Sequence, residues 1–140
     1  MRWTILACTL WLLAATSEAA SVHVRLIRAA NRSAPADQHL TDIAPKLKPV
    51  FGYDHYAQLG SKRAALQGDK TLKLYPGEGF TVFVTPKGHA RNTHELEVAL
   101  YSGKVSVTKA TVKIAENNSV FIKGPEVGAT LIIVALTVRE

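Results

Sequence analysis

From residue 62 to the end of the chain, short apolar and β-branched segments alternate with turn signals, and no other feature constrains the fold as strongly. The turn signals are Gly68-Asp69, Pro76-Gly77-Glu78-Gly79, Ser102-Gly103 and Glu116-Asn117-Asn118. The connections are short, whereas parallel strands need crossovers of about a dozen residues or more. The pattern therefore predicts antiparallel strands.

Strands are expected near residues 22–28, 63–66, 71–75, 80–85, 94–101, 105–113, 119–122 and 130–138. Segment 94–101 alternates, with Leu96, Val98 and Leu100 on one face, as a strand with one buried face does. Segment 130–138 is nearly continuous in apolar residues, which predicts a central strand buried on both faces. Seven or eight such strands predict a mainly β fold, an antiparallel β-sandwich, with a partly open barrel as the alternative.

One short helix is expected after the first strand. The segment has apolar residues at helical spacing, at Leu40, Ile43, Ala44 and Leu47. Asp37 can cap a helix that starts at Gln38. Pro45 lies inside the pattern, and proline removes a backbone donor and clashes with the preceding turn. We therefore expect a short or kinked helix, and the alternative is two short turns joined at Ala44.

The N-terminus has the layout of a secretory signal peptide. Arg2 is followed by thirteen uncharged residues at 3–15 and by a small-x-small site at Ser17-Glu18-Ala19. The apolar run is too short for a membrane span, which takes about 20 residues, and the sequence has no second run of that length. We expect a signal peptide over 1–20, a single β-rich domain over 21–140, and export to the periplasm or the extracellular space. Cleavage would remove Cys8, the only cysteine, which suits an oxidising compartment.

The 140-residue chain carries a net charge of +6, and its basic residues are spread along the sequence. Nucleic-acid binders cluster basic residues and interleave them with aromatics, so no nucleic-acid partner is expected. Spread positive charge suits weak binding to an anionic polymer. The alternative is that the lysines are solvated and keep sheet edges from aggregating.

Two histidines, His89 and His94, lie five residues apart across a polar segment, 86–92, which we expect to be a loop. A zinc site needs three or four converging ligands, and the cations Lys87 and Arg91 beside these histidines repel a metal. We therefore expect no metal and no cofactor. The alternative function is a small secreted hydrolase or a metal-binding protein that uses this loop.

No catalytic residue is expected, and the chain is not predicted to be an enzyme. No serine lies in a G-x-S-x-G elbow. Gly77-Glu78-Gly79 precedes a strand at Phe80, whereas a phosphate-binding loop precedes a helix. Glu95 and Glu97 share a strand face, which is the pattern of an ordinary solvent-facing strand.

Three aromatic residues, Phe51, Tyr53 and Tyr56, lie within six positions. We expect them to form a turn that packs the helix against a sheet. If exposed, Tyr53, His55 and Tyr56 would instead offer a binding patch. The candidate binding residues are therefore Tyr53, His55, Tyr56, His89, Arg91 and His94.

Two segments carry a resemblance. The pattern Phe-Gly-Tyr-x-x-Tyr-x-x-Leu follows the expected helix at 51–59, and Phe-Ile-Lys-Gly-Pro at 121–125 is followed by Leu-Ile-Ile-Val at 131–134. In these patches the chain resembles small exported bacterial β-rich proteins of unknown function. The resemblance implies a bacterial envelope context and carries over no catalytic residue.

We therefore expect a non-enzymatic binding or accessory module of the cell envelope, whose partner is a protein or an anionic envelope polymer. In the accessory-subunit version, strand 130–138 lies at a sheet edge and pairs with a strand of the partner. The sequence leaves the oligomeric state open.

Overall fold

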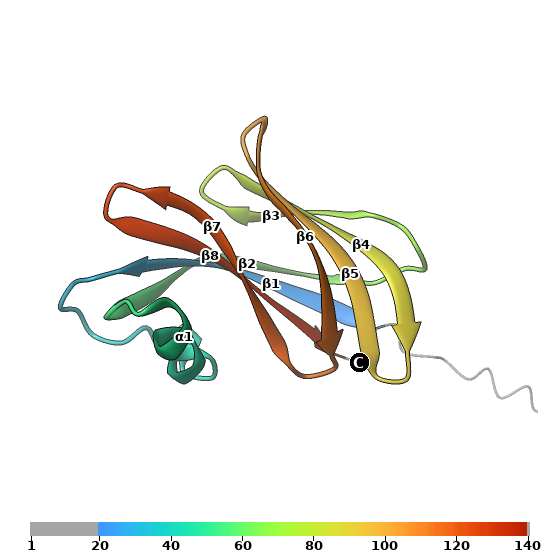
Figure 1. The fold of residues 1–140 in the computed structure, drawn as a ribbon, viewed down its shortest axis with the longest axis horizontal. Helices are drawn as coiled ribbons and strands as arrows, with labels where there is room; N and C mark the ends of the chain where they lie inside the picture. The colour runs from blue at the N-terminus through green and yellow to red at the C-terminus, as the bar shows by residue number, and fades with distance from the viewer. Residues whose placement is uncertain (1–19, 140) are drawn as a thin grey trace, which may run out of the picture.

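A computed structural model describes residues 20–139, which form two antiparallel sheets packed together and a helical segment outside one of them (Figure 1). The strands are β1 (Ser21–Ala30), β2 (His55–Ala65), β3 (Leu72–Gly77), β4 (Phe80–Ala90), β5 (Thr93–Ser102), β6 (Val105–Ala115), β7 (Ser119–Val127) and β8 (Thr130–Arg139). The expected signal peptide lies outside the described residues, apart from Ala20. Among residues 20–139, no helix has the length and hydropathy to cross a membrane.

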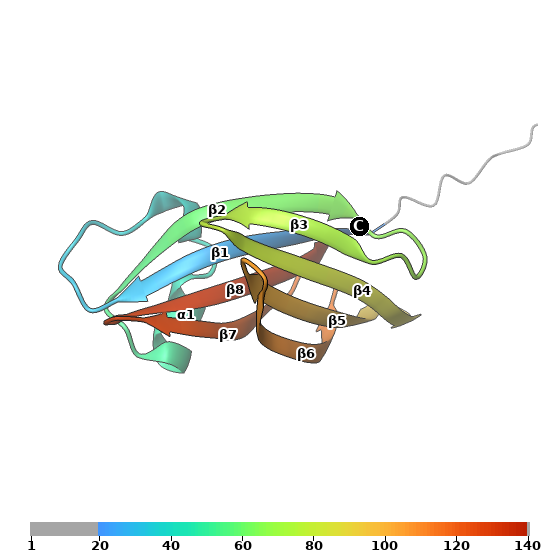
Figure 2. The same ribbon diagram turned by 90° about the horizontal axis from the view of Figure 1, so that it is seen from above.

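The strands form one sheet in the order β2-β1-β8-β7 and a second in the order β3-β4-β5-β6, as Figure 2 shows. The second sheet is a simple meander, while the first pairs β1 with β8, the first and last described strands. The prediction of a mainly β, antiparallel sandwich with one short helix after the first strand is confirmed.

The main core lies between the sheets. In β5 the even-numbered residues from His94 to Leu100 are buried, and the odd-numbered residues face outward. Strand β8 is buried on both faces from Leu131 to Val138, as its continuous apolar sequence predicts. It pairs with β1 on one side and β7 on the other, so it has no free edge. The expectation that strand 130–138 pairs with a partner's strand at a sheet edge is therefore wrong.

The helical segment between β1 and β2 is broken into two pieces, a 3₁₀ turn η1 (Gln38–Leu40) and a helix α1 (Ala44–Phe51). The alternative of two short turns joined at Ala44 is thus close to the observed structure. Pro45 lies in the first turn of α1, where a missing backbone N–H costs little, so it favours a helix that starts at Ala44. Pro49 lies inside the same short helix, near its end at Phe51.

The helical segment covers one end of the outer face of the sheet β2-β1-β8-β7 (Figure 1). Leu40, Ile43 and Leu47 are buried in a second apolar cluster with residues of β1 and β8. These β1 and β8 residues are Ile27, Ala29, Leu131, Ile133 and Ala135. Where the helical segment lies, residues 20–139 therefore form three layers, and none of these residues covers the outer face of the other sheet.

Two local expectations are wrong. Segment 51–59 is not a single turn, because β2 already begins at His55. Segment 86–92 is not a loop, because β4 continues to Ala90 and only Arg91 and Asn92 form the turn. Strand β3 pairs with β4 only as far as Val84, so Pro86 lies where β4 has a free side, and proline is tolerated at such an edge.

Candidate functional site

The aromatic residues Tyr53 and Tyr56 do not form an exposed patch. Tyr56 is buried, and its hydroxyl donates to the carbonyl of Leu47 and accepts from the backbone N–H of Tyr53, both at 3.2 Å. Burial raises the pKa of the Tyr56 hydroxyl. Tyr53 and His55 are half-buried, and His55 Nε2 lies 2.9 Å from the Pro35 carbonyl oxygen. These residues hold the helical segment against β2.

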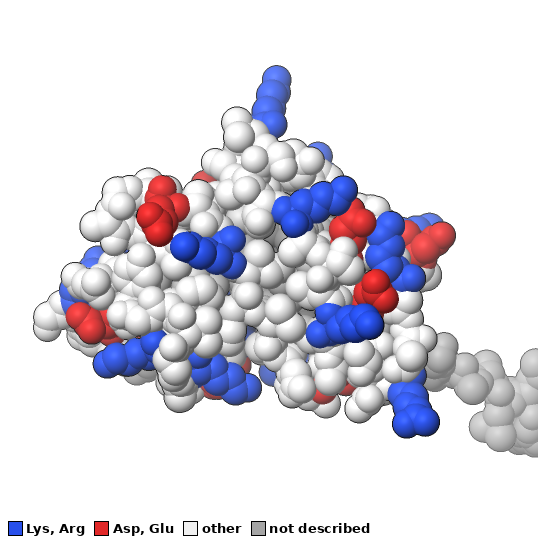
Figure 3. All heavy atoms as spheres, viewed as in Figure 1, with Lys and Arg blue, Asp and Glu red and all other residues white. Residues whose placement is uncertain are grey.

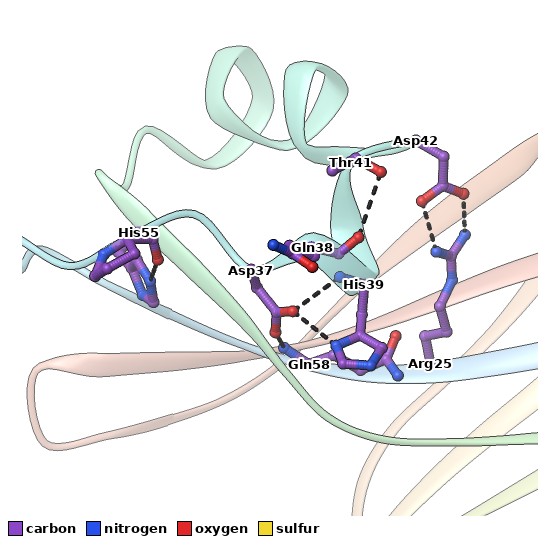
Figure 4. Close-up of polar contacts among 9 residues, drawn as sticks. Arg25, Asp37, Gln38, His39, Thr41, Asp42, His55 and Gln58 are labelled. Carbon is purple, nitrogen blue, oxygen red and sulfur yellow. Dashed lines mark hydrogen bonds and ion pairs between the residues drawn. The ribbon is translucent and has the colours of Figure 1, made fainter.

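A group of polar contacts fastens the same segment to β1 and β2 (Figure 4). The Asp37 carboxylate accepts from the backbone N–H groups of Gln58 at 2.8 Å and His39 at 2.9 Å, and these bonds lower its pKa. Arg25 donates to both carboxylate oxygens of Asp42 at 2.9 Å. The Arg25 side chain is only 5% exposed. The Asp37–Gln58 and Arg25–Asp42 contacts are structural, since each joins the helical segment to a strand.

Beside the Arg25–Asp42 pair, an open hollow of about 350 Å³ is lined by His23, Arg25, Arg63 and Arg139 together with polar residues. Burial, with the charges of the three arginines, lowers the pKa of His23 to about 4. This corner of the molecule is therefore strongly electropositive, although Asp42 balances one of its arginines.

The structure brings His89 and His94 together and adds Glu116. The two imidazole rings stack with centroids 4.3 Å apart and planes at 17°. The Glu116 Oε1 atom lies 3.2 Å from His94 Nε2 and 3.9 Å from His89 Nε2. Arg91, the remaining predicted binding residue, is exposed in the β4–β5 turn with φ 58°.

Glu116 follows the end of β6 and was not predicted. Its position depends on the register of β5 with β6, in which His94 lies opposite Ile114. That register brings the residues just beyond β6 close to His94. The sequence marks residues 116–118 only as a turn, so it holds no signal that places this carboxylate beside two histidines.

A hollow of about 570 Å³ lies on the outer face of the sheet β3-β4-β5-β6. It is lined by Thr71, Lys73, Thr81, Phe83, Glu97, Ala99, Tyr101, Gly103, Lys104 and Lys109. Lys73, Phe83, Ala99 and Lys109 form one row across the four strands. The small Ala99 side chain leaves the space between its larger neighbours. We call this region the open face.

The open face combines aromatic rings with charge. Phe83 and Tyr101 pack edge to face with centroids 5.3 Å apart, and Lys73 Nζ lies 5.7 Å from the Phe83 centroid. Glu97 Oε1 lies 3.0 Å from Lys109 Nζ, and this hydrogen bond lowers the pKa of the Glu97 carboxyl. Lys87 Nζ is 3.5 Å from the other Glu97 oxygen.

The residues of the open face are absent from the predicted binding set, although the sequence contains a signal for one of them, Phe83. Segment 80–85 alternates Phe80, Val82 and Val84 with Thr81, Phe83 and Thr85. The first three residues face the core, so a phenylalanine at 83 faces solvent. A large aromatic ring on a solvent-facing strand position is the feature that distinguishes this face from an ordinary polar one.

On the face of the molecule seen in Figure 3, basic and acidic side chains are interspersed near β4 and β5, and uncharged atoms cover the centre. The positive net charge is thus distributed rather than gathered there into one field. No family model matches the chain, and neither the curated proteins nor the solved structures include a match to it.

Proposed function

We propose that this protein is a non-enzymatic binding module of the bacterial cell envelope, and that it binds an anionic glycan polymer on the open face. The observation that carries this proposal is the hollow of about 570 Å³ that Phe83 and Tyr101 line together with three lysines. Its volume lies within the range of about 300–1,000 Å³ that is typical of ligand sites.

The chemistry of the open face matches a charged sugar polymer. Phe83 and Tyr101 offer apolar ring surface, which suits the flat face of a sugar ring. Lys73, Lys104 and Lys109 line the same hollow, against the single carboxylate of Glu97 among its lining residues. The local charge therefore favours carboxylate or phosphate groups on the ligand.

The same contacts argue for binding rather than catalysis. General acid–base or nucleophilic catalysis needs a group that is free to exchange a proton or attack. Glu97, the carboxylate among the residues that line the hollow, is held between Lys109 and Lys87. The pairing stabilises its charged form, so it serves to position the lysines.

Affinity electrophoresis of the full chain tests this proposal, with polygalacturonate in one gel and neutral dextran in the other. The wild type is expected to be retarded by polygalacturonate and not by dextran. Lys73→Gln and Phe83→Ala should each reduce the retardation at least several-fold. Lys46→Gln is the matched control, because Lys46 lies on α1, away from the open face, and the change in net charge equals that of Lys73→Gln.

Equal losses in Lys46→Gln and Lys73→Gln would show that net charge alone drives binding and would overturn the proposal. Absence of retardation for the wild type would do the same. Affinity enrichment from the host then tests for a protein partner instead of a glycan. A stoichiometric protein partner that is lost on Phe83→Ala would make the open face a protein-binding surface.

A further inference from the structure

We infer that His89, His94 and Glu116 form a binding site for a divalent transition-metal ion, with Zn²⁺ as the expected ion. This site is separate from the open face, so the inference does not depend on the proposed function. One ligand atom of each of the three side chains lies within 4.8 Å of the others.

A β-bulge is what brings the two histidines onto one face. In β4, Pro86 pairs with Leu96 and Gly88 pairs with Glu95, so Lys87 is an extra residue in the strand. Without the bulge, His89 would share the outward face of Thr85, because successive side chains alternate. With it, His89 lies directly opposite His94, on the core-facing side of the sheet at its end.

The backbone around the site holds the third residue in place. The N–H of Glu116 donates to the carbonyl of Asn92 in the β4–β5 turn at 2.8 Å. The N–H of Asn117 donates to the carbonyl of Val138 in β8 at 2.7 Å. The turn that carries Glu116 is thus fixed to both sheets, and the side chains of Glu116 and His94 are 13% and 9% exposed.

To form a metal site the exposed His89 ring must turn out of its stack on His94, because two parallel stacked imidazoles cannot both direct a nitrogen lone pair at one ion. Zinc binds imidazole nitrogen and carboxylate oxygen at about 2.0–2.2 Å, which puts neighbouring tetrahedral ligand atoms roughly 3.4 Å apart. The His94–Glu116 distance of 3.2 Å already fits, and the His89–Glu116 distance of 3.9 Å is slightly long. His89 is 51% exposed and lies next to the turn, so it is free to close the gap.

The nearby cations do not oppose a metal as strongly as their sequence positions indicate. Lys87 reaches Glu97 on the open face, so its charge is turned away from His89 and partly neutralised. Lys113 lies opposite Glu95, whose side chain also faces away from the core. Arg91 is exposed to solvent, which screens its charge.

The donor set selects the class of ion. Two imidazoles and one carboxylate suit Zn²⁺, Cu²⁺ and Ni²⁺, whereas Mg²⁺ and Ca²⁺ prefer oxygen ligands alone. Three protein ligands leave a fourth tetrahedral position for water or for a group of a bound molecule. His94 Nε2 must present its lone pair to the ion, so metal coordination replaces its present contact with Glu116.

The inference is tested by titration calorimetry with ZnCl₂ on the full chain, produced without a polyhistidine tag. One Zn²⁺ per chain is expected to bind. His89→Ala and Glu116→Gln should each weaken binding at least 10-fold. His89 is exposed, so His89→Ala should fold normally. The matched control is His39→Ala, because His39 is an exposed histidine distant from the site, and this variant should bind Zn²⁺ as the wild type does.

Imidazole ¹H–¹⁵N correlation spectra identify the ligands independently of affinity. The chain has five histidines, and Zn²⁺ should shift the signals of His89 and His94 alone. Undetectable binding to the wild type, unchanged affinity in both His89→Ala and Glu116→Gln, or Zn²⁺-dependent shifts at other histidines would each overturn the inference.

Discussion

The outer faces of the two sheets differ. On the sheet β2-β1-β8-β7, the helical segment buries Ile27 and Ile133 completely. On the sheet β3-β4-β5-β6, outward positions carry Phe83, Ala99 and Tyr101, and these residues remain partly exposed. Much of one outer face is therefore part of the core, whereas the outward side chains of the other sheet are not covered by residues 20–139.

The amino-acid sequence of each sheet reflects this difference. Strand β8 is apolar at nearly every position because both of its faces are covered. Strand β5 alternates because only one of its faces is covered. The proposed binding function uses the alternating sheet, where an aromatic side chain at an outward position is not needed for the core.

The largest effect expected is on the covered face. Leu47→Ala removes a fully buried side chain between α1 and the sheet, and should lower the free energy of unfolding by about 2–5 kcal/mol. Val50→Ala on the same helix is the control, because Val50 is 65% exposed and its loss should cost about 0.5 kcal/mol or less. Urea unfolding measures both. Equal effects would contradict the burial of this face by α1.

The second effect concerns the ion pair that ties the helical segment to β1. Asp42→Asn leaves the buried Arg25 without a carboxylate and should cost about 1–3 kcal/mol at pH 7. The hydrogen bond from Arg25 lowers the pKa of the Asp42 carboxyl in the folded protein. The ion pair therefore stabilises the fold fully above the usual carboxyl pKa, and this stabilisation is lost as the pH falls through the lowered pKa of Asp42. The free energies of unfolding of the wild type and Asp42→Asn should therefore converge in acid. A difference between them that persists at low pH would exclude the ion pair as the cause of the difference. Asp69→Asn in an exposed turn is the control.

A third prediction concerns His23, at the uncovered end of the same sheet. Its pKa is about 4 in the folded protein against an ordinary value of 6.5, so the unfolded chain binds the proton more readily between these values. His23 therefore costs no stability above pH 6.5, and its protonation in the unfolded chain lowers the stability of the fold as the pH falls toward 4.

His23→Gln should remove this dependence, which we expect to amount to about 1–2 kcal/mol after allowing for solvent screening. Thermal unfolding from pH 7 to pH 4 measures it, with His39→Gln as the control. An unchanged pH profile in His23→Gln would show that other groups cause the acid instability.

The fold was largely predictable from the sequence, because hydrophobic alternation and turn residues are local signals. The central position of β8 followed from its continuous apolar sequence, and the alternatives that Pro45 left open included a break near Ala44. The end of β4 was not predictable, because Pro86 and Gly88 are typical of loops. They are tolerated in this strand because β3 is too short to pair with it there.

The candidate sites were much less predictable. Tyr53 and Tyr56 were proposed as binding residues, yet Tyr56 is used in packing α1 against β2. The proximity of His89 to His94 depends on a bulge, and that of Glu116 on the register of β5 with β6. Both are properties of strand pairing, and pairing between strands is not encoded in the spacing of residues along one segment.

The smallest effect on stability should accompany the clearest loss of binding. Ala99→Leu adds a larger side chain at the floor of the hollow, on a face that residues 20–139 leave uncovered, so stability should change by about 0.5 kcal/mol or less. The added side chain fills the space between Phe83 and Lys109, and retardation by polygalacturonate should be lost.

Thr111→Leu is the control, since Thr111 is exposed on the same sheet but does not line the hollow. Wild-type retardation of Ala99→Leu would exclude the hollow as the binding site. A large loss of stability in Ala99→Leu would mean that this face is covered, and the contrast between the two sheets would then fail.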